Sequence, residues 1–188
     1  MLEDRELGLE ASLTGSVYNY REIRQQLQDL GYRFNSKNET ELVIKAYHRW
    51  GENFVKRLNG AFAFSLYDHR RGLLHLGRDP LGLKQLYYSA NGKICFGTDL
   101  ESLKQQGLED FTLDKEALHY YLTFHAVVPA PLTIFSVVRK VEPGTVLTFE
   151  QDGSKRVNRY WSLNMNCRNG LDREEWIERI LAAMRRSI

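Results

Sequence analysis

Apolar and polar residues alternate along several stretches of the chain, which predicts β-strands there. In residues 7–18 leucine and alanine recur at every second position, and in residues 61–67 phenylalanine and leucine alternate with small side chains. A period of two places successive side chains on opposite faces of a strand. Asn-Gly and Asp-Gly pairs at residues 91–92 and 152–153 each separate two extended segments, as in β-hairpins. The predicted strands are residues 7–18, 61–67, 73–78, 85–89, 93–98, 144–150 and 156–162.

Other stretches repeat their apolar residues every three to four positions, which predicts helices. Residues 20–30 carry isoleucine and leucine at positions i, i+4 and i+7, and Gly31 stands where a helix commonly ends. A second helix follows, in which Asn38 and Glu41 have the spacing of a capping box. Hairpins and amphipathic helices together predict an α+β fold. The predicted helices are residues 20–30, 38–50, 53–58, 99–106, 113–123 and 171–186.

The composition is that of an ordinary globular protein. Of the 188 residues, 43% are hydrophobic and 27% are charged, and the net charge of +2 is too even to indicate binding to nucleic acid or to an anionic membrane. The apolar runs are too short for a transmembrane span. Cys95 and Cys167 lie far apart and form no CxxC pair, so we expect neither a zinc site nor a disulfide. The simplest expectation is a cytoplasmic protein with no metal, membrane or nucleic acid as partner.

Residue spacing alone assigns no catalytic residue. The chain contains no GxSxG, Walker, HExxH or GxGxxG motif. Cys95 lies in the middle of a predicted strand, where we expect it to be a small buried hydrophobe. The segment GRDPLG allows two interpretations: a strand end and turn closed by a charge pair, or an anion site built on its arginine. The turn is the simpler interpretation, because a guanidinium near a turn usually binds backbone carbonyls and a carboxylate. The characteristic residues of this motif are Gly77, Arg78, Asp79 and Gly82.

Three segments together resemble the glutaminase domain of asparagine synthetases and related class II glutamine amidotransferases. They read GAFAFSLYD in residues 60–68, LGRDPLGLKQLYY in residues 76–88 and KICFGTDLESL in residues 93–103. The resemblance covers residues 12–188, which is nearly the whole chain. It implies the fold of an N-terminal-nucleophile hydrolase, a sandwich of two antiparallel sheets flanked by helices, which we expect to be incomplete at its N-terminus here.

The same resemblance divides the chain into two parts. Residues 1–163 correspond to a type 2 glutamine amidotransferase domain. Residues 164–188 correspond to a linker and the first helix leading toward an ATP-dependent synthetase domain, which would follow in cis. We therefore expect ATP and magnesium only in that further domain, and no cofactor within residues 1–188.

The resemblance also implies where substrate binds and how the site has changed. In the family an asparagine side chain and the N–H of the next glycine form the oxyanion hole, and Thr14 and Gly15 occupy these positions here. Ser16 replaces the glutamate that follows. Glu39 stands in place of an aspartate that binds the α-amino group of glutamine. These four residues are the expected substrate-binding positions.

Catalytic elements of the family have no counterpart in the chain. Leu2 stands where complete members carry the nucleophilic cysteine, and the family segment with an arginine for the glutamine carboxylate is missing before Leu13. Thr14 also lacks the amide donor of the asparagine, and loss of an oxyanion donor costs on the order of 10²–10³ in rate. We therefore expect the chain to be inactive as a glutaminase and to bind glutamine weakly at best.

Three hypotheses about function remain open at this point. The first is a glutaminase-like domain of an asparagine-synthetase-type protein, whose parent forms an amide on aspartate or a related carboxylate with ATP and glutamine or ammonia. The second is a non-catalytic module that binds a ligand or a partner; a missing first strand would leave a sheet edge unpaired and favour a homo-oligomer. The third is a domain of a β-lactam-synthetase-like enzyme.

Overall fold

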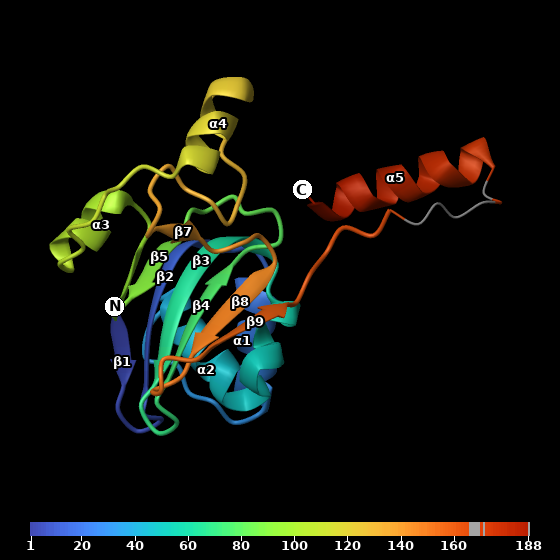
Figure 1. Ribbon diagram of the computed structural model, residues 1–188. Helices are drawn as coiled ribbons and strands as arrows, with labels where there is room; N and C mark the ends of the chain where they lie inside the picture. Colours follow the sequence, from blue (N-terminus) through green and yellow to red (C-terminus); the bar gives the residue numbers. More distant parts are fainter. Residues whose placement is uncertain (166–169, 171, 188) are drawn as a thin grey trace.

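The computed structural model describes residues 1–165, 170 and 172–187 of the chain, which build two antiparallel sheets and the helices around them (Figure 1). The larger sheet has six strands in the order β1-β2-β3-β4-β8-β9, and the smaller sheet has the order β6-β5-β7. The strands of the larger sheet are β1 (Leu2–Asp4), β2 (Leu9–Val17), β3 (Gly60–Asp68), β4 (Leu73–Arg78), β8 (Thr145–Phe149) and β9 (Lys155–Arg159). Those of the smaller sheet are β5 (Tyr87–Asn91), β6 (Lys93–Gly97) and β7 (Arg139–Lys140).

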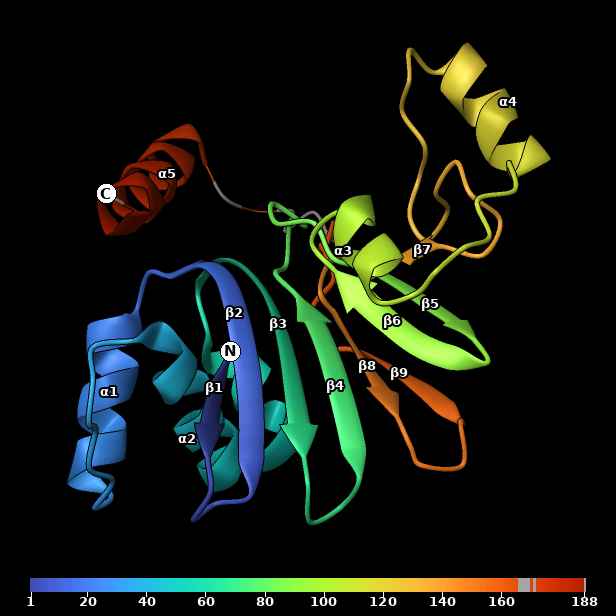
Figure 2. The same cartoon turned by 90° about the vertical axis from the view of Figure 1, so that its left-hand side faces the viewer.

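Helices cover one face of the larger sheet. Figure 2 shows α2 (Glu39–Trp50) behind β1, β2 and β3, and α1 (Tyr20–Asp29) to the left of these strands, where it packs against α2; a 3-10 helix (Gly51–Arg57) continues from α2. Their apolar side chains form one core with the strands, because the period of two in β3 points Phe62, Phe64 and Leu66 to the same side. This core lies between the helices and the larger sheet.

The smaller sheet packs on the opposite face of the larger one, over its central strands (Figure 2). Leu76 of β4 and Leu147 of β8 contribute to this second core from the larger sheet. Tyr88 of β5 and Leu86, which directly precedes β5, contribute from the other side. Strand β3 is therefore buried on both faces, which explains why its second face carries small residues such as Ala63. Two sheets packed face to face with helices outside confirm the predicted sandwich.

Most predicted elements form close to their expected bounds, and two short strands were not predicted. Strand β1 and strand β7 have three and two residues and carry no periodic pattern. The expected helix at residues 53–58 is a 3-10 helix that begins at Gly51. The predicted linker at residues 164–170 falls largely outside the described residues. The remaining helices are α3 (Leu100–Gln105), α4 (Lys115–Thr123) and α5 (Arg173–Ser187).

The start of α2 differs from the predicted capping box. Asn38 is the N-cap, and its side chain accepts a hydrogen bond from the N–H of Thr40 at 2.9 Å. Glu41, however, does not reach back to Asn38. It accepts hydrogen bonds from the backbone N–H groups of Asn35 and Ser36 instead. The capping-box prediction is therefore right for Asn38 and wrong for Glu41, because the preceding loop folds under the helix and offers closer donors.

The edge of β2 is partly covered, which corrects the expectation of a fully unpaired edge. Strand β1 pairs with β2 from Leu9 to Ala11 and reaches no further along it. On its other side β2 pairs with β3 along its whole length. Beyond Ala11 the N–H of Val17 is bonded to Glu39, so the open part of this edge is residues 12–16.

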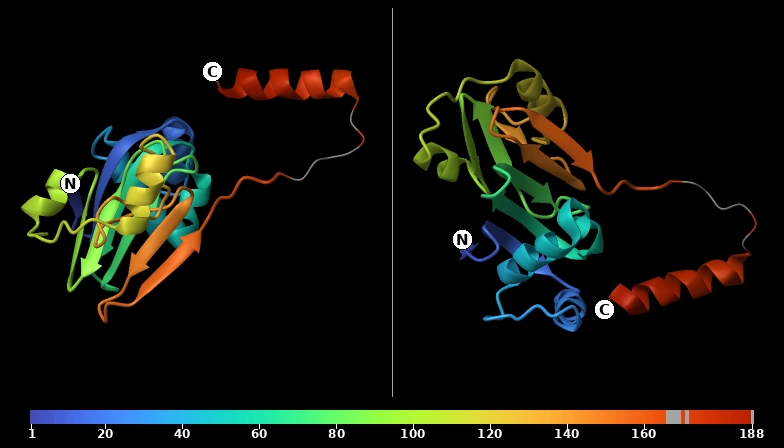
Figure 3. Two further views of the ribbon diagram at one scale, coloured as in Figure 1. Left: turned by 45° about the horizontal axis from the view of Figure 1, so that its top comes forward. Right: turned by 90° about the horizontal axis from the view of Figure 1, so that it is seen from below.

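Two helices lie away from this sandwich. Among the described side chains of α4, only Ala117 is buried, and the helix protrudes above the smaller sheet (Figure 1). Helix α5 lies apart from both sheets (Figure 3). In the described part of the chain, none of the helices is long and apolar enough to cross a membrane.

Candidate functional site

The structure joins two of the predicted site residues directly. Ser16 near the end of β2 donates a hydrogen bond from Oγ to Glu39 Oε1 at 2.9 Å. The backbone N–H of Val17 donates to Glu39 Oε2 at 2.7 Å. Both oxygens of this carboxylate therefore hold the end of β2 against the start of α2. We call this meeting point of residues 14–17 and Glu39 the β2 mouth.

Glu39 is positioned by the local fold of the helix start. Asn38 has extended backbone angles (φ −73°, ψ 126°), and the helix begins with Glu39. A carboxylate in the first turn of a helix interacts favourably with the partial positive charge of the free N–H groups there. The same geometry turns the Glu39 side chain toward β2, and its half-buried carboxylate is stabilised from two sides.

Gly15 presents its backbone to the open edge of β2. In an antiparallel strand the N–H and C=O groups of one residue point to the same side, and the side alternates along the strand. Because Val17 N–H turns outward to Glu39, the N–H of Gly15 also points outward, beyond the reach of β1. Gly15 has φ +99°, and an added Cβ would lie 2.0 Å from the carbonyl oxygen of Ala61. Only glycine fits here, so this N–H is an exposed donor fixed by the fold.

Thr14 lines a small cavity next to the mouth. The cavity has a volume of about 240 Å³ and lies between the larger sheet and the end of β6. Thr14 itself is exposed. A threonine hydroxyl can both donate and accept a hydrogen bond, but it lacks the second donor of an amide. The other hydroxyl groups around this cavity belong to Ser12, Ser65, Thr98 and Ser102.

Arg78 holds the loop that follows β4. Its side chain is 4% exposed and makes four hydrogen bonds to acceptors of this loop and its surroundings. Burial lowers the pKa of the guanidinium, and the nearby carboxylate of Asp79 opposes that shift. The acceptors are the carbonyl oxygens of Lys84, Gly82 and Val141 and the side-chain Oε1 of Gln85.

Asp79 complements Arg78 from inside the same loop. Its carboxylate is 1% exposed and accepts hydrogen bonds from the backbone N–H groups of Leu81, Leu83 and Lys84, each at 3.0 Å. The two charged side chains therefore bind separate backbone groups of one turn. This arrangement supports the turn interpretation of the GRDPLG motif, because the guanidinium is directed at protein carbonyls. The expected charge pair is not formed, since Arg78 and Asp79 make no ion pair among the described residues and bind separate groups instead.

Lys84 is a residue that the sequence interpretation did not single out. An added Cβ on Gly15 would lie 2.9 Å from Lys84 Cγ, so the aliphatic chain of this lysine passes next to Gly15. The two residues are far apart in the sequence. In the sequence, Lys84 stands at the end of the loop that Arg78 and Asp79 hold. Its proximity to Gly15 arises only when the chain folds.

The described residues do not place a nucleophilic cysteine at the mouth. Cys95 lies on β6, is 3% exposed and directs its sulfur toward the carbonyl of Gln106 at 3.8 Å. This confirms the expected buried hydrophobe. His75 is likewise buried, between Tyr47 Oη and Thr148 Oγ1. Among the described residues, no group of three or more histidine, cysteine or acidic side chains could hold a metal ion.

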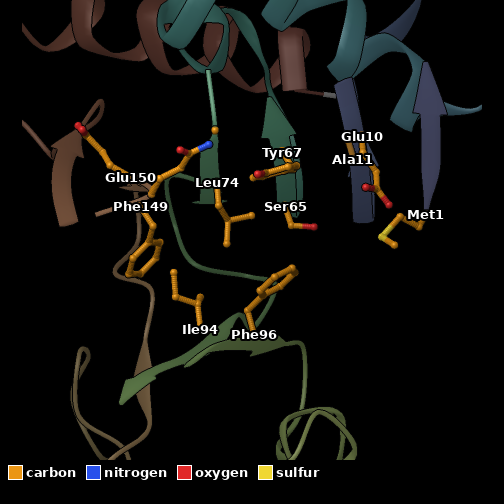
Figure 4. A pocket seen from close by; sticks show the side chains of 12 residues that line it. Met1, Glu10, Ala11, Ser65, Tyr67, Leu74, Ile94, Phe96, Phe149 and Glu150 are labelled. Atoms are coloured by element: carbon orange, nitrogen blue, oxygen red, sulfur yellow. The ribbon is translucent and has the colours of Figure 1, made fainter. Parts of the chain in front are cut away.

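A larger pocket adjoins the Thr14 cavity and shares Met1, Ser65 and Phe96 with it. It has a volume of about 420 Å³, and Figure 4 shows Leu74, Ile94, Phe96 and Phe149 converging on it from the two sheets. The predicted site residues do not line it. Its walls are mainly apolar, so it belongs to the gap between the sheets rather than to the polar mouth.

The fold defines the class of protein: it is the N-terminal-nucleophile hydrolase sandwich of glutamine amidotransferases. A glutamine phosphoribosylpyrophosphate amidotransferase from B. subtilis, complexed with ADP and GMP, is similar to it with a TM-score of 0.56 and 20% identity. That comparison covers 84% of this chain and 30% of the solved one. A structure of the allosteric regulatory enzyme of purine biosynthesis gives a TM-score of 0.55, with 21% identity over 84% of this chain and 29% of the other.

The sequence comparison then identifies the family. The model of the glutamine amidotransferase domain matches residues 2–161, and the chain belongs to this family. Asparagine synthetase (glutamine-hydrolyzing) 1 of Bacillus subtilis (strain 168) is 37% identical over 151 residues, which is 80% of this chain and 24% of that protein. Amidase chry2 of Gibberella zeae is 32% identical over 161 residues, or 85% of this chain and 23% of that protein. The chain spans about a quarter of the length of these relatives.

Proposed function

We propose that this chain is the glutaminase-like domain of an asparagine-synthetase-type protein and that it does not hydrolyse glutamine. In this proposal glutamine is a weak ligand at the β2 mouth. The parent protein forms an amide on aspartate or a related carboxylate with ATP and magnesium, in a synthetase domain that follows in cis. The similarity to an asparagine synthetase of Bacillus subtilis supports the assignment to such a parent.

The observation that carries the proposal is the chemistry of the mouth. The N–H of Gly15 remains available as a donor, but Thr14 offers a hydroxyl where the resemblance expects an amide. Both oxygens of Glu39 already accept protein hydrogen bonds from Ser16 and Val17. An oxyanion hole with one donor missing loses on the order of 10²–10³ in rate. Cys95 cannot compensate as nucleophile, because its thiol is buried on β6.

The direct test is release of glutamate from glutamine by the purified chain. We expect no release above a blank without protein. The Cys95→Ser variant is the matched control, because it removes the thiol of Cys95, the cysteine that lies within the described residues. Release by the wild-type chain that follows the protein through purification contradicts the proposal, and its loss in Cys95→Ser would identify Cys95 as the nucleophile. Thr14→Asn, which restores an amide, should bind glutamine without making the chain active.

A second function, partner binding through the edge of β2, has one observation in its favour. The open part of this edge, residues 12–16, carries uncharged side chains with no lysine or proline. Natural proteins commonly protect such edges with charge, and unprotected edges pair with other chains. Sedimentation over a range of concentrations tests this function. A homo-oligomer that Leu13→Lys dissociates supports it, and a monomer at every concentration contradicts it.

A further inference from the structure

The larger pocket between the sheets has a floor built from one row of side chains that crosses four strands. In the register of the larger sheet each member of this row lies opposite the next: Glu10 (β2), Tyr67 (β3), Leu74 (β4) and Phe149 (β8). Directly opposed residues of antiparallel strands point to the same face of the sheet. All four line the pocket, and Figure 4 shows Glu10 and Phe149 on opposite sides of it. The floor therefore has a carboxylate at one end and is largely apolar along the rest.

Strand β6 of the smaller sheet forms the roof of this pocket. Ile94 and Phe96 are two residues apart, so their side chains point to the same face of β6. Both line the pocket, and both are only partly buried, so their apolar surface faces the space between the sheets. The volume of about 420 Å³ lies within the range of roughly 300–1,000 Å³ that sites for small molecules occupy.

The charged side chains that line the pocket are acidic. Among the described residues they are Glu10 and Glu150, with no lysine, arginine or histidine beside them. The side chain of Glu10 is 28% exposed, and its Oε2 lies 3.5 Å from Nε2 of His69, which is charged only when it is protonated. No other cationic group of the described residues, the α-amino group of Met1 included, lies within 4.0 Å of this carboxylate. A neutral His69 therefore leaves the charge of Glu10 available to a ligand.

We propose that this pocket binds an arylalkyl amine, an organic cation whose apolar body lies between the floor and the roof and whose ammonium contacts Glu10. The apolar walls remove hydrophobic surface of the ligand from water, and an ammonium forms a charge-assisted hydrogen bond with a carboxylate. An anionic end would instead be repelled by Glu10 and Glu150. The inference is independent of the proposed function, because none of the four predicted substrate-binding residues lines this pocket.

The test compares three probes that share a phenyl ring and a short alkyl chain. The ends of 4-phenylbutylamine, 4-phenylbutan-1-ol and 4-phenylbutyrate are positive, neutral and negative. Methyl chemical shifts of Leu74 and Ile94 are followed by NMR while each probe is added to the whole chain at pH 8, where a histidine side chain is ordinarily uncharged. We expect the amine to bind about tenfold more tightly than the alcohol, and the carboxylate to bind more weakly than the alcohol.

Three variants separate the charge from the apolar walls. Glu10→Gln keeps the size of the side chain and removes its charge, so the amine should bind about tenfold more weakly and the alcohol as in wild type. Ile94→Trp fills the pocket and should abolish the shifts of Leu74 with every probe. Glu116→Gln in α4 removes an exposed carboxylate that does not line the pocket, and this control should behave as wild type.

Three results overturn the inference. The first is equal affinity of the wild-type chain for the amine and the alcohol, which would make the pocket an apolar site without preference for charge. The second is an unchanged preference for the amine in Glu10→Gln, measured on a variant whose urea unfolding curve matches wild type. The third is the absence of shifts at Leu74 and Ile94 up to the solubility limit of the amine. If the chain then sediments as an oligomer that Ile94→Trp dissociates, a second copy occupies the pocket instead.

Discussion

Two glutamates in the first turn of α2 have different environments although they are only two residues apart. Glu39 is half-buried at the β2 mouth and accepts hydrogen bonds from Ser16 and the N–H of Val17. Glu41 is 4% exposed and forms an ion pair with Lys45 at 2.5 Å. One carboxylate holds the partly exposed β2 mouth, and the other is enclosed by its own chain.

The enclosed carboxylate is strongly stabilised in its charged form. Burial by itself would raise the pKa of Glu41, but hydrogen bonds from Lys45, Ser36 and the backbone of Asn35 outweigh it and lower the pKa to about 2. Lys45 also donates to the carbonyl of Arg33, so it ties the loop before α2 to the helix. A glutamate in the first turn of a helix can thus hold a neighbouring strand at the surface or form a buried ion pair. The residues that pack against it determine which of these contacts it makes.

The largest expected effect comes from removing the buried charge. Glu41→Gln leaves Lys45 as an unpaired buried cation, so the free energy of unfolding should fall by about 3 to 5 kcal/mol. Urea unfolding followed by circular dichroism measures it. Glu39→Gln is the matched control two residues away in the same helix. Equal losses of unfolding free energy in the two variants would show that the two glutamates contribute equally to stability.

The pH dependence of stability should follow Glu41. Its pKa is about 2 in the folded chain against a usual value of 4.5, so the unfolded chain binds the proton first as the pH falls. The stabilisation is complete above pH 4.5 and is lost as the pH falls toward 2, in total about 3 kcal/mol. Urea unfolding at several pH values measures it in wild type and in Glu41→Gln. The difference between the two profiles of unfolding free energy against pH isolates the contribution of Glu41. Parallel profiles would contradict the assignment of this pH dependence to Glu41.

Removing the charge at the mouth should cost much less. Glu39→Gln keeps one acceptor oxygen and loses one of the two hydrogen bonds to β2, so we expect a loss of about 1 kcal/mol. The measurement is again urea unfolding, together with hydrogen exchange at the amide of Val17. Exchange at Val17 should speed up in this variant and remain unchanged in Glu41→Gln. Faster exchange at Val17 in Glu41→Gln but not in Glu39→Gln would contradict the assignment of this contact to Glu39.

The smallest expected effect tests the side-chain hydrogen bond at the mouth. Ser16→Ala removes the donor to Glu39 Oε1 and leaves the stronger contact from Val17, so stability should change by about 0.5 kcal/mol. The freed oxygen should make Glu39 a better partner for an ammonium, and L-glutamine should bind more tightly, as titration followed by NMR would show. Weaker binding would indicate that Ser16 itself contacts the ligand.

Much of the fold was predictable from short-range patterns. Alternation located β2 and β3, and the two Xaa-Gly pairs located the hairpins of β5 with β6 and of β8 with β9. Strand β1 was not predictable, because three residues of mixed polarity have no period and form a strand only against Leu9 to Ala11. The capping role of Glu41 was mistaken for the same reason, since spacing along a helix does not show which loop lies beneath it.

The candidate site was predictable only in part. The resemblance pointed to Thr14, Gly15, Ser16 and Glu39, and the structure adds that Ser16 and Glu39 bind each other. Lys84 could not be found, because its proximity to Gly15 depends on how the loop after β4 is folded. That fold requires Arg78 and Asp79 to bind backbone groups that are scattered along the chain.

The sequence by itself determined the local elements, the turn chemistry of the GRDPLG loop and the membership in a family of glutamine amidotransferases. Periodicity, turn residues and motif spacing involve residues that are close in the sequence, so they can be recognised from the sequence alone. The tertiary structure alone decided that Glu39 holds the end of β2, that Glu41 belongs to the core and that Lys84 lies beside Gly15. These contacts depend on strand register and on the packing of α2, and both are set by the burial of side chains that lie far apart in the sequence.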